Sequence, residues 1–373
     1  MGWLDGWDAR RDQEAAREQL RRAAGFAGVE EVERAAGAFD AAEFPESGCA
    51  FQLVVSPGSV RLGTKMVWEL DRAPEPPLVS GDGWDQPALW EDSVRREIRE
   101  WSRKSRANMV KTIAALDFKE WLSRSGGALG MVTLTLPREW LVVAPSGKAF
   151  KRLVRALRRR MVRAGVEPVG VWKLEFQRRG APHLHIMMRC PTWVGRERFE
   201  VWLSRAWAEV CRDSLDPPER DQWVASGEFA RHLGAGTAVD FDRRDVKDPR
   251  RAAIYFLGHS AKTGDGKEYQ HRVPPAWRGE GLGPGRFWGV WGLKPRRRVV
   301  ELRGRDWYRA RRMLRHVRRA RAWEVAASRA RHAGRRVWDV VSPKVRGFGA
   351  RGGGTVVVND GPRLARGLAA ALA

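Results

Sequence analysis

Cysteine, tyrosine and long apolar segments are all scarce in this chain of 373 residues. Its three Cys residues, Cys49, Cys190 and Cys211, are far apart, so neither a disulfide framework nor a zinc knuckle is predicted. No apolar run reaches the length of a membrane span, and the first residues lack the pattern of a signal peptide. We therefore expect a protein of a reducing cytoplasm that does not associate with membranes.

Lysine is also scarce, although the chain is strongly basic. Of its 69 basic residues only 12 are Lys and the other 57 are Arg, and the net charge is +24. The guanidinium group matches the geometry of phosphate and stacks on bases, so this composition favours a nucleic-acid partner. A GC-rich genome, which enriches Arg whatever the function of the protein, is the alternative explanation.

The charge is distributed unevenly along the chain and indicates three regions. The first 85 residues hold 9 basic and 16 acidic residues, and we expect an acidic, helical N-terminal extension over residues 1–88. The last 78 residues hold 21 basic and 5 acidic residues. Here we expect a basic helical extension over residues 296–373, with one helix at about 306–332 and a partly disordered tail. A central domain over residues 89–295 lies between them.

The apolar pattern of the central domain predicts an α+β fold. We expect a central antiparallel sheet of about five strands with helices on one face. The predicted strands lie at residues 130–137, 169–177 and 182–190, and the predicted helices at about 89–122 (broken near 102–105), 148–163, 196–211 and 248–262. Asp248 and Pro249 suit the first positions of the last helix.

The third predicted strand carries a pair of histidines, His183 and His185. Alternate residues of a strand share a face, so both imidazoles leave the same side of the sheet. If residues 178–180 form a three-residue hairpin loop with Gly180 left-handed, Glu175 lies directly opposite His183. Two imidazoles and a carboxylate that leave coordination positions open suit Mn²⁺ or Mg²⁺.

Two other interpretations of the histidine pair stay open. Both histidines could be ordinary polar residues on a solvated sheet face, with Glu175 paired to Lys173 or Arg178. A cupin-type metalloenzyme also places His-x-His on strands, but it normally has a Glu a few residues later. None follows the pair in this chain before Glu197, which disfavours a cupin.

The helix predicted from Asp248 carries a second set of reactive side chains. Tyr255, His259 and Lys262 are spaced so that they lie on one stripe of a helix. A Tyr with a Lys two turns away can act as a nucleophile with a group that stabilises charge. The alternative is a core Tyr whose hydroxyl is satisfied by some hydrogen bond.

Three ordered motifs resemble those of the HUH endonuclease superfamily of rolling-circle replication initiators and relaxases. They are VTLTLP (132–137), PHLH (182–185) and YFLGHSAK (255–262). The interval from Glu175 to the histidine pair resembles that of members with an acidic third ligand. The sequences WKLEFQRRGAPHLH, KEYQHRVPPAW and GRFWGVWGL further resemble replication-associated proteins of actinobacterial plasmids and phages, which are related to filamentous-phage initiators.

The resemblance covers about residues 100–295 and implies an HUH/RRM-like nickase core. It implies that Tyr255 attacks a DNA phosphate and leaves a 5′-phosphotyrosine and a free 3′-hydroxyl. Lys262 would stabilise charge and His259 would assist proton transfer, while His183, His185 and Glu175 would hold Mg²⁺ or Mn²⁺. Some members have a second Tyr where this chain has His259, so the closing step has no assigned residue.

The resemblance also implies the partners and the setting: single-stranded DNA, origin duplex DNA, a host helicase and a polymerase, in the cytoplasm of a bacterium. A helicase is expected because the chain has no Walker A motif. Thr133 and Thr135, which share one face of their predicted strand, are expected to support the site or to contact DNA. A single-Tyr relaxase or transposase, and a non-catalytic DNA-binding protein, are the alternative functions.

Overall fold

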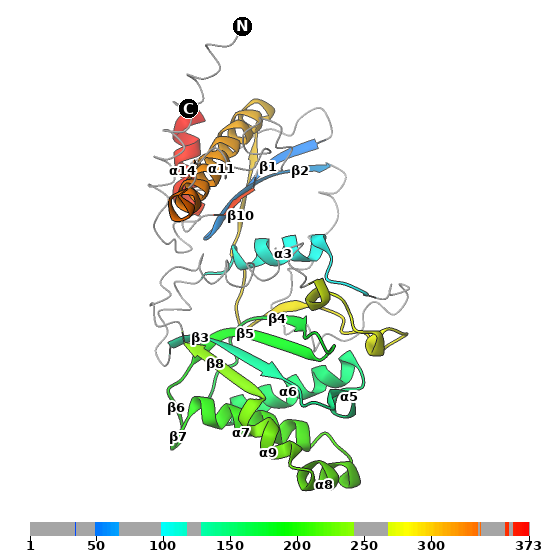
Figure 1. Ribbon diagram of the computed structural model, residues 1–373. Helices are drawn as coiled ribbons and strands as arrows, with labels where there is room; N and C mark the ends of the chain where they lie inside the picture. The colour runs from blue at the N-terminus through cyan, green and yellow to red at the C-terminus, as the bar shows by residue number, and fades with distance from the viewer. Residues whose placement is uncertain are drawn as a thin grey trace. The chain divides into compact units, whose positions relative to one another are not determined.

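The computed structural model (Figure 1) describes residues 34, 49–66, 98–117, 128–241, 268–334, 336, 355–357 and 361–372. Contacts between Cα atoms divide the chain into two compact units. Unit 1 combines residues 1–77, 111–120 and 295–373, and unit 2 combines residues 78–110 and 121–294. None of the helices within the described ranges is long and apolar enough to cross a membrane.

Unit 2 is built on a five-stranded antiparallel sheet, in the order β8-β3-β5-β4-β9 (Figure 1). The strands are β3 (Ala128–Thr135), β4 (Gly170–Phe176), β5 (Pro182–Cys190), β8 (Thr237–Phe241) and β9 (Trp288–Trp291). The strand that carries the histidine pair, β5, is central. The predicted α+β class with a sheet of five strands is confirmed.

The main helices of unit 2 are α6 (Gly147–Arg163) and α7 (Phe199–Arg212), which lie on the same side of the sheet in Figure 1. Helix α6 begins where the Ser146 hydroxyl accepts a hydrogen bond from the Ala149 amide at 3.1 Å. The apolar residues that follow recur every three or four positions and are buried: Phe150, Leu153, Val154, Leu157 and Met161. Arg160 connects the two helices through Glu209 and Asp213, each at 2.6 Å.

Shorter elements complete unit 2. They are α5 (Trp140–Val143), α8 (Pro217–Ala225), α9 (Glu228–Ala235), the two-stranded ribbon β6 (Trp193–Val194) and β7 (Glu197–Arg198), and the 3₁₀ turns η2 (Glu268–His271) and η3 (Pro275–Trp277). Helix α3 (Arg103–Ile113) begins in this unit. The helix predicted from Asp248 lies outside the described residues.

Unit 1 is a second antiparallel sheet, in the order β10-β1-β2-β11, together with helices α11 and α14. Its elements are β1 (Cys49–Ser56), β2 (Ser59–Met66), β10 (Arg298–Leu302), β11 (Thr355–Val357), α11 (Gly304–Ala333) and α14 (Gly361–Leu372). The predicted basic helix corresponds to α11. Figure 1 shows α14 beside α11, and both helices share an apolar core with the strands.

The N-terminal end of the chain differs from the helical extension that the sequence predicted, whereas the helical C-terminal extension is confirmed by α11 and α14 and also contains β10 and β11. The described N-terminal residues form the hairpin β1–β2, which pairs with strands from the C-terminal segment to make one sheet. In β1, Phe51, Leu53 and Val55 share the face that packs into this core, as alternate residues of a strand do, and Val54 on the other face is also buried. The tail predicted as partly disordered contains β11 and α14, because Leu364 and Leu368 lie one helical turn apart and are buried. The boundaries at residues 88 and 295 stay predictions.

Candidate active site

The polar face of the unit 2 sheet holds two adjacent cross-strand rows. One row is Thr135–His183–Glu175 and the other is Thr133–His185–Lys173, read across β3, β5 and β4. The register is set by the β4–β5 loop, in which Gly180 has φ +84° and donates its amide to the Gln177 carbonyl at 2.8 Å. The predicted placement of Glu175 opposite His183 is therefore confirmed.

Glu175 is bound by two partners at once. Its Oε1 accepts a hydrogen bond from Lys173 Nζ at 2.7 Å, and its Oε2 lies 3.2 Å from His185 Nε2. Lys173 and Glu175 are only 1% and 3% exposed. Burial opposes ionisation of the carboxyl group, but the hydrogen bond with His185 and the charge of Lys173 prevail and lower the pKa of Glu175 to about 2. The carboxylate is thus ionised at neutral pH.

The two imidazoles differ in their surroundings. Nδ1 of His185 lies 3.1 Å from the Thr133 hydroxyl, which can donate to this nitrogen or accept from it, depending on the tautomer. His183 has its ring centroid 4.4 Å from that of His185, and its buried Nε2 has no hydrogen-bond partner among the residues that the structure describes. Burial and the neighbouring His185 lower the pKa of His183 to about 4. His183 is therefore neutral at pH 7, which is the form that binds metals.

The donor atoms fit a divalent metal by their chemistry. Ligands about 2.1 Å from an ion and at right angles lie about 3 Å apart, which is close to the separation of His185 Nε2 and Glu175 Oε2. A buried nitrogen without a partner, such as His183 Nε2, calls for one. Within the described ranges, no three His, Cys, Asp or Glu side chains form a ready-made metal cluster. The assignment of His183, His185 and Glu175 as ligands therefore stays a prediction.

Neighbouring elements fix the edges of this face. The Thr135 hydroxyl donates to the carbonyls of Ala235 and Gly236, at 3.3 and 3.1 Å, and so connects β3 to the end of α9. At the other edge Trp288, the cross-strand neighbour of Lys173, donates its indole N–H to Ser105 at 3.0 Å. These bonds hold the polar rows in place from both sides.

The remaining predicted site residues, Tyr255, His259 and Lys262, lie outside the described residues. Their positions relative to the histidine pair thus stay predictions. From the sequence, Lys173 was expected to pair with Glu175 only in the alternative interpretation, in which the histidines bind no metal. The structure shows that Glu175 contacts Lys173 and His185 together. The contact between Lys173 and Glu175 could have been predicted from the sequence, because the two residues are two positions apart and so share one face of the strand.

The site lies on an antiparallel α+β domain whose polar face carries imidazoles and a buried carboxylate. Residues 130–259, which contain these side chains, match the family model for the replication-associated protein ORF2/G2P. This central part of the chain is therefore similar to replication-associated proteins of the ORF2/G2P type.

A relative supports this placement. Over 204 residues the chain is 27% identical to a protein of Xylella fastidiosa (strain 9a5c) that is named "Putative replication protein". The similarity covers 54% of this chain and 59% of the relative, so the chain spans about three fifths of that protein. No solved structure matches the chain.

Proposed function

We propose that the protein is a DNA nickase that initiates rolling-circle replication. The observation that carries the proposal is the placement of Glu175, His183 and His185 on one sheet face, inside the segment that matches a replication-initiator family. Initiators of that family are nicking enzymes. The proposed substrate is single-stranded DNA at an origin, and the proposed nucleophile is Tyr255.

The side chains of the polar face would bind a cation next to the scissile phosphate. Glu175 provides a carboxylate that stays ionised, and His183 provides a neutral imidazole. Thr133 orients the ring of His185 through Nδ1 and leaves Nε2 to face Glu175. A bound Mg²⁺ or Mn²⁺ would supply Lewis-acid polarisation of a non-bridging phosphate oxygen. Lys173 holds Oε1 of Glu175 and so leaves Oε2 directed at the histidines.

The proposed chemical step is a transesterification. The Tyr255 hydroxyl gives its proton to His259 and its oxygen forms a bond to phosphorus; the bond from phosphorus to the 3′-oxygen breaks, and that oxygen takes up the proton. The products are a 5′-phosphotyrosine and a 3′-hydroxyl that a polymerase can extend. Lys262 would stabilise the charge on the phosphate, and His259 would pass the proton to the leaving oxygen.

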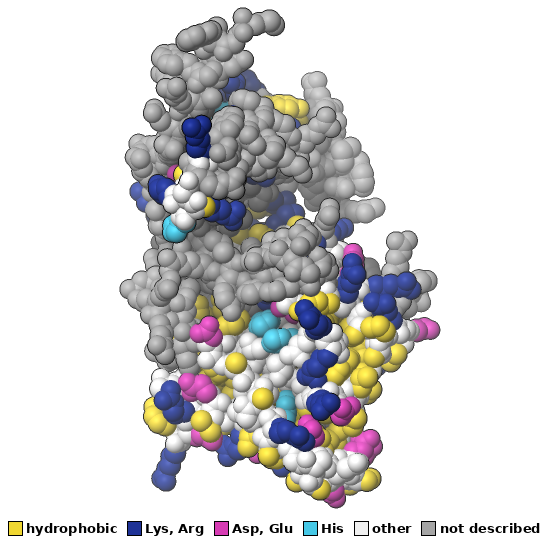
Figure 2. Space-filling view, in the orientation of Figure 1, with side chains coloured by type: hydrophobic (Ala, Val, Ile, Leu, Met, Phe, Trp, Pro, Cys, Tyr) yellow, Lys and Arg dark blue, Asp and Glu magenta, His cyan; other side chains and the backbone are white. Residues whose placement is uncertain are grey.

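Two basic surfaces suit the proposed DNA partners. On the face shown in Figure 2, Lys and Arg side chains (dark blue) form a band along unit 2 beside hydrophobic side chains (yellow). In unit 1, helix α11 exposes a series of Arg residues, among them Arg305, Arg309, Arg312 and Arg315. We assign single-stranded DNA to unit 2 and origin duplex DNA to α11. A host helicase would separate the strands.

The test is whether a covalent adduct forms with a labelled single-stranded origin oligonucleotide in Mn²⁺. We expect an adduct that withstands denaturing electrophoresis with the wild type and none with Tyr255→Phe. Tyr308→Phe is the matched control, since this Tyr is 60% exposed on α11 and has no assigned role. DNA binding without an adduct in the wild type, or equal adducts in wild type and Tyr255→Phe, would refute the nickase and favour a non-catalytic binding protein.

A further inference from the structure

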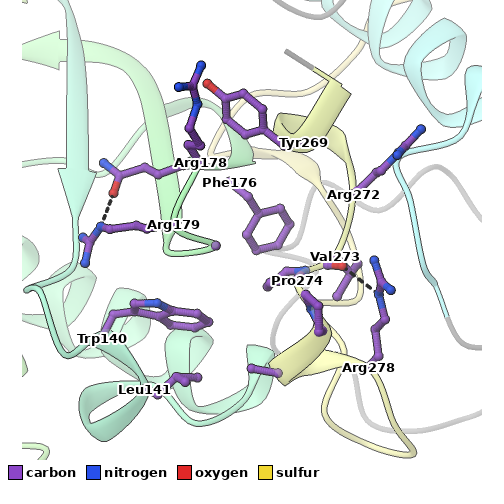
Figure 3. A pocket seen from close by; sticks show the side chains of 14 residues that line it. Trp140, Leu141, Phe176, Arg178, Arg179, Tyr269, Arg272, Val273, Pro274 and Arg278 are labelled. Carbon is purple, nitrogen blue, oxygen red and sulfur yellow. Dashed lines mark hydrogen bonds between the residues drawn. The ribbon is translucent and has the colours of Figure 1, made fainter. Parts of the chain in front are cut away.

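A pocket of about 660 Å³ opens at the β4–β5 loop of unit 2 (Figure 3). One wall is the loop itself with α5, and the other is the segment 269–278 that contains η2 and η3. The pocket begins at Phe176, which directly follows Glu175 of the candidate active site but points to the opposite face of β4. Its volume lies within the range of small-molecule sites, roughly 300–1,000 Å³.

The walls of the pocket are fixed by the protein itself. The guanidinium group of Arg179 donates to the carbonyls of Leu136 and Pro137 at 2.6 Å each, which anchors the loop to the end of β3. Gly180 lies at the base, where an added Cβ would come within 3.2 Å of Pro274 and 3.6 Å of Trp140. Because the cavity is already formed, the protein loses little conformational entropy when a ligand enters it.

Aromatic rings line the pocket and are braced from behind. Trp277 packs edge-on against both Trp140 and Phe176, at centroid distances of 5.5 and 5.7 Å. Its indole N–H donates to the Ala144 carbonyl at 3.1 Å. Tyr269 lies at the opposite end of the pocket from Trp140, next to Arg178 (Figure 3). Trp140 and Phe176 are themselves buried, at 6% and 2% exposed, so the ring that is available to a planar ligand is that of the half-buried Tyr269.

The charge at the pocket is entirely positive. Arg178 and Arg272 are exposed and make no ion pair or hydrogen bond within the part of the chain that the structure describes. Arg278 uses only its Nε, in a bond to the Val273 carbonyl at 3.0 Å. None of the described lining residues is Asp or Glu. Cations without counterions attract an anionic ligand, and Arg favours phosphate.

We infer that this pocket binds one nucleotide of single-stranded DNA next to the scissile phosphate. The base stacks on the ring of Tyr269, and Arg178 and Arg272 contact the flanking phosphates. A base held in a duplex cannot enter such a cavity, so the pocket selects a single strand. Arg178 is three residues beyond Glu175, which is at most about 10 Å along the chain. This inference rests on the proposed function, because that function brings DNA to the end of the sheet where β4 and β5 are joined.

The test measures the affinity of the full chain for a fluorescent oligo-dT strand and for a duplex of equal length, across a range of salt concentrations. We expect the Arg178→Ala/Arg272→Ala double variant to bind the single strand about tenfold more weakly. The slope of log affinity against log salt should fall by about 1.4, or about 0.7 for each phosphate that the variant no longer neutralises. Tyr269→Leu should lose about tenfold, and Tyr269→Phe should bind as the wild type does.

Arg196→Ala is the matched control for the two arginine substitutions. Arg196 is also exposed and without a partner in the described structure, and it lies in the β6–β7 turn, away from α5 in Figure 1. Its substitution should change the affinity less than twofold. Wild-type affinity and slope in the double variant would overturn the inference. An equal loss of single-strand and duplex binding would also overturn it, since it would show a non-selective basic surface.

The adduct assay separates this inference from the proposed function. If the wild type forms the adduct but the pocket variants bind DNA normally, the pocket assignment fails and the nickase stands. If no adduct forms but the pocket variants lose single-strand binding, the nickase fails and the pocket stands.

Discussion

The two sheets of this protein have similar architecture and opposite chemistry. In unit 1, the sheet residues that pack against α11 and α14 are apolar, such as Leu53, Val60 and Leu62. In unit 2, the sheet buries a lysine and a glutamate, Lys173 and Glu175, beside two histidines. Burying charges is expensive even when they are paired. Unit 2 therefore holds the candidate active site, and the core of unit 1 is mainly structural.

The largest expected effect comes from removing a predicted metal ligand from unit 2. We expect His183→Ala and His185→Ala each to weaken Mn²⁺ binding by about 100-fold or more, since a ligand should matter at least as much as its hydrogen-bond partners. Isothermal titration calorimetry measures this. His332→Ala in α11 of unit 1 is the matched control and should bind Mn²⁺ as the wild type does. Equal Mn²⁺ affinities in all three variants would contradict the placement of the metal site in unit 2.

The second effect concerns the stability that depends on the buried ion pair. Lys173→Met should lower the free energy of unfolding by about 3–5 kcal/mol, because it leaves the Glu175 charge buried without its ammonium partner. Urea denaturation in a chelator measures this without any metal contribution. The double variant Lys173→Met/Glu175→Leu should recover most of the loss. If the double variant were no more stable than the single one, the buried charge would not be the cause.

The third effect is a dependence of the free energy of unfolding on pH. It is contributed by His232, which lies on α9 and is 5% exposed. Burial and the nearby charge of Arg179 lower its pKa from 6.5 to about 4. Because the pKa is lower in the folded state, the stabilising contribution is complete above pH 6.5 and is lost as the pH falls towards 4. Between pH 7 and 4.5, protonation of His232 should lower the free energy of unfolding by roughly 2–3 kcal/mol.

The measurement is the free energy of unfolding of wild type and His232→Gln over that pH range. The difference between the two proteins removes the contributions of other titrating groups, such as His183. We expect the curve of the variant to be flatter by the stated amount. Parallel curves would show that His232 does not contribute.

The smallest effect tests the orientation of His185. Thr133→Val removes the hydroxyl next to Nδ1 but keeps the size of the side chain, and it should weaken Mn²⁺ binding about tenfold. Thr133→Ser keeps the hydroxyl and should restore the affinity. An unchanged affinity in Thr133→Val would show that the hydrogen bond does not position the ring.

The sequence predicted the local geometry of unit 2 well. The strand and helix periods are strong there, and Gly180 in a short loop fixes the register that places Glu175 opposite His183. Burial of the carboxylate was not predictable, because nothing in a strand pattern shows what covers its polar face. The pocket at residues 269–278 depends on a segment about a hundred residues from the β4–β5 loop, and no local signal connects the two.

Unit 1 was poorly predicted for a similar reason. The pairing of β1 with β10 joins residues about 250 positions apart, and only tertiary contacts specify it. The acidic composition of the first 85 residues concealed the short alternating pattern around Leu53. The helix α11 was predictable, because it is long and ends at Gly334, which has φ +61°.

The central claim is tested most directly by identifying the amino acid that carries DNA after cleavage. Wild-type protein would be incubated with a single-stranded origin oligonucleotide in Mn²⁺, digested with protease and analysed by mass spectrometry. We expect the nucleotide on Tyr255, and no adduct in a chelator or with Glu175→Gln. A nucleotide on Tyr269 or Tyr308, or an adduct that needs neither the metal nor Glu175, would contradict the account.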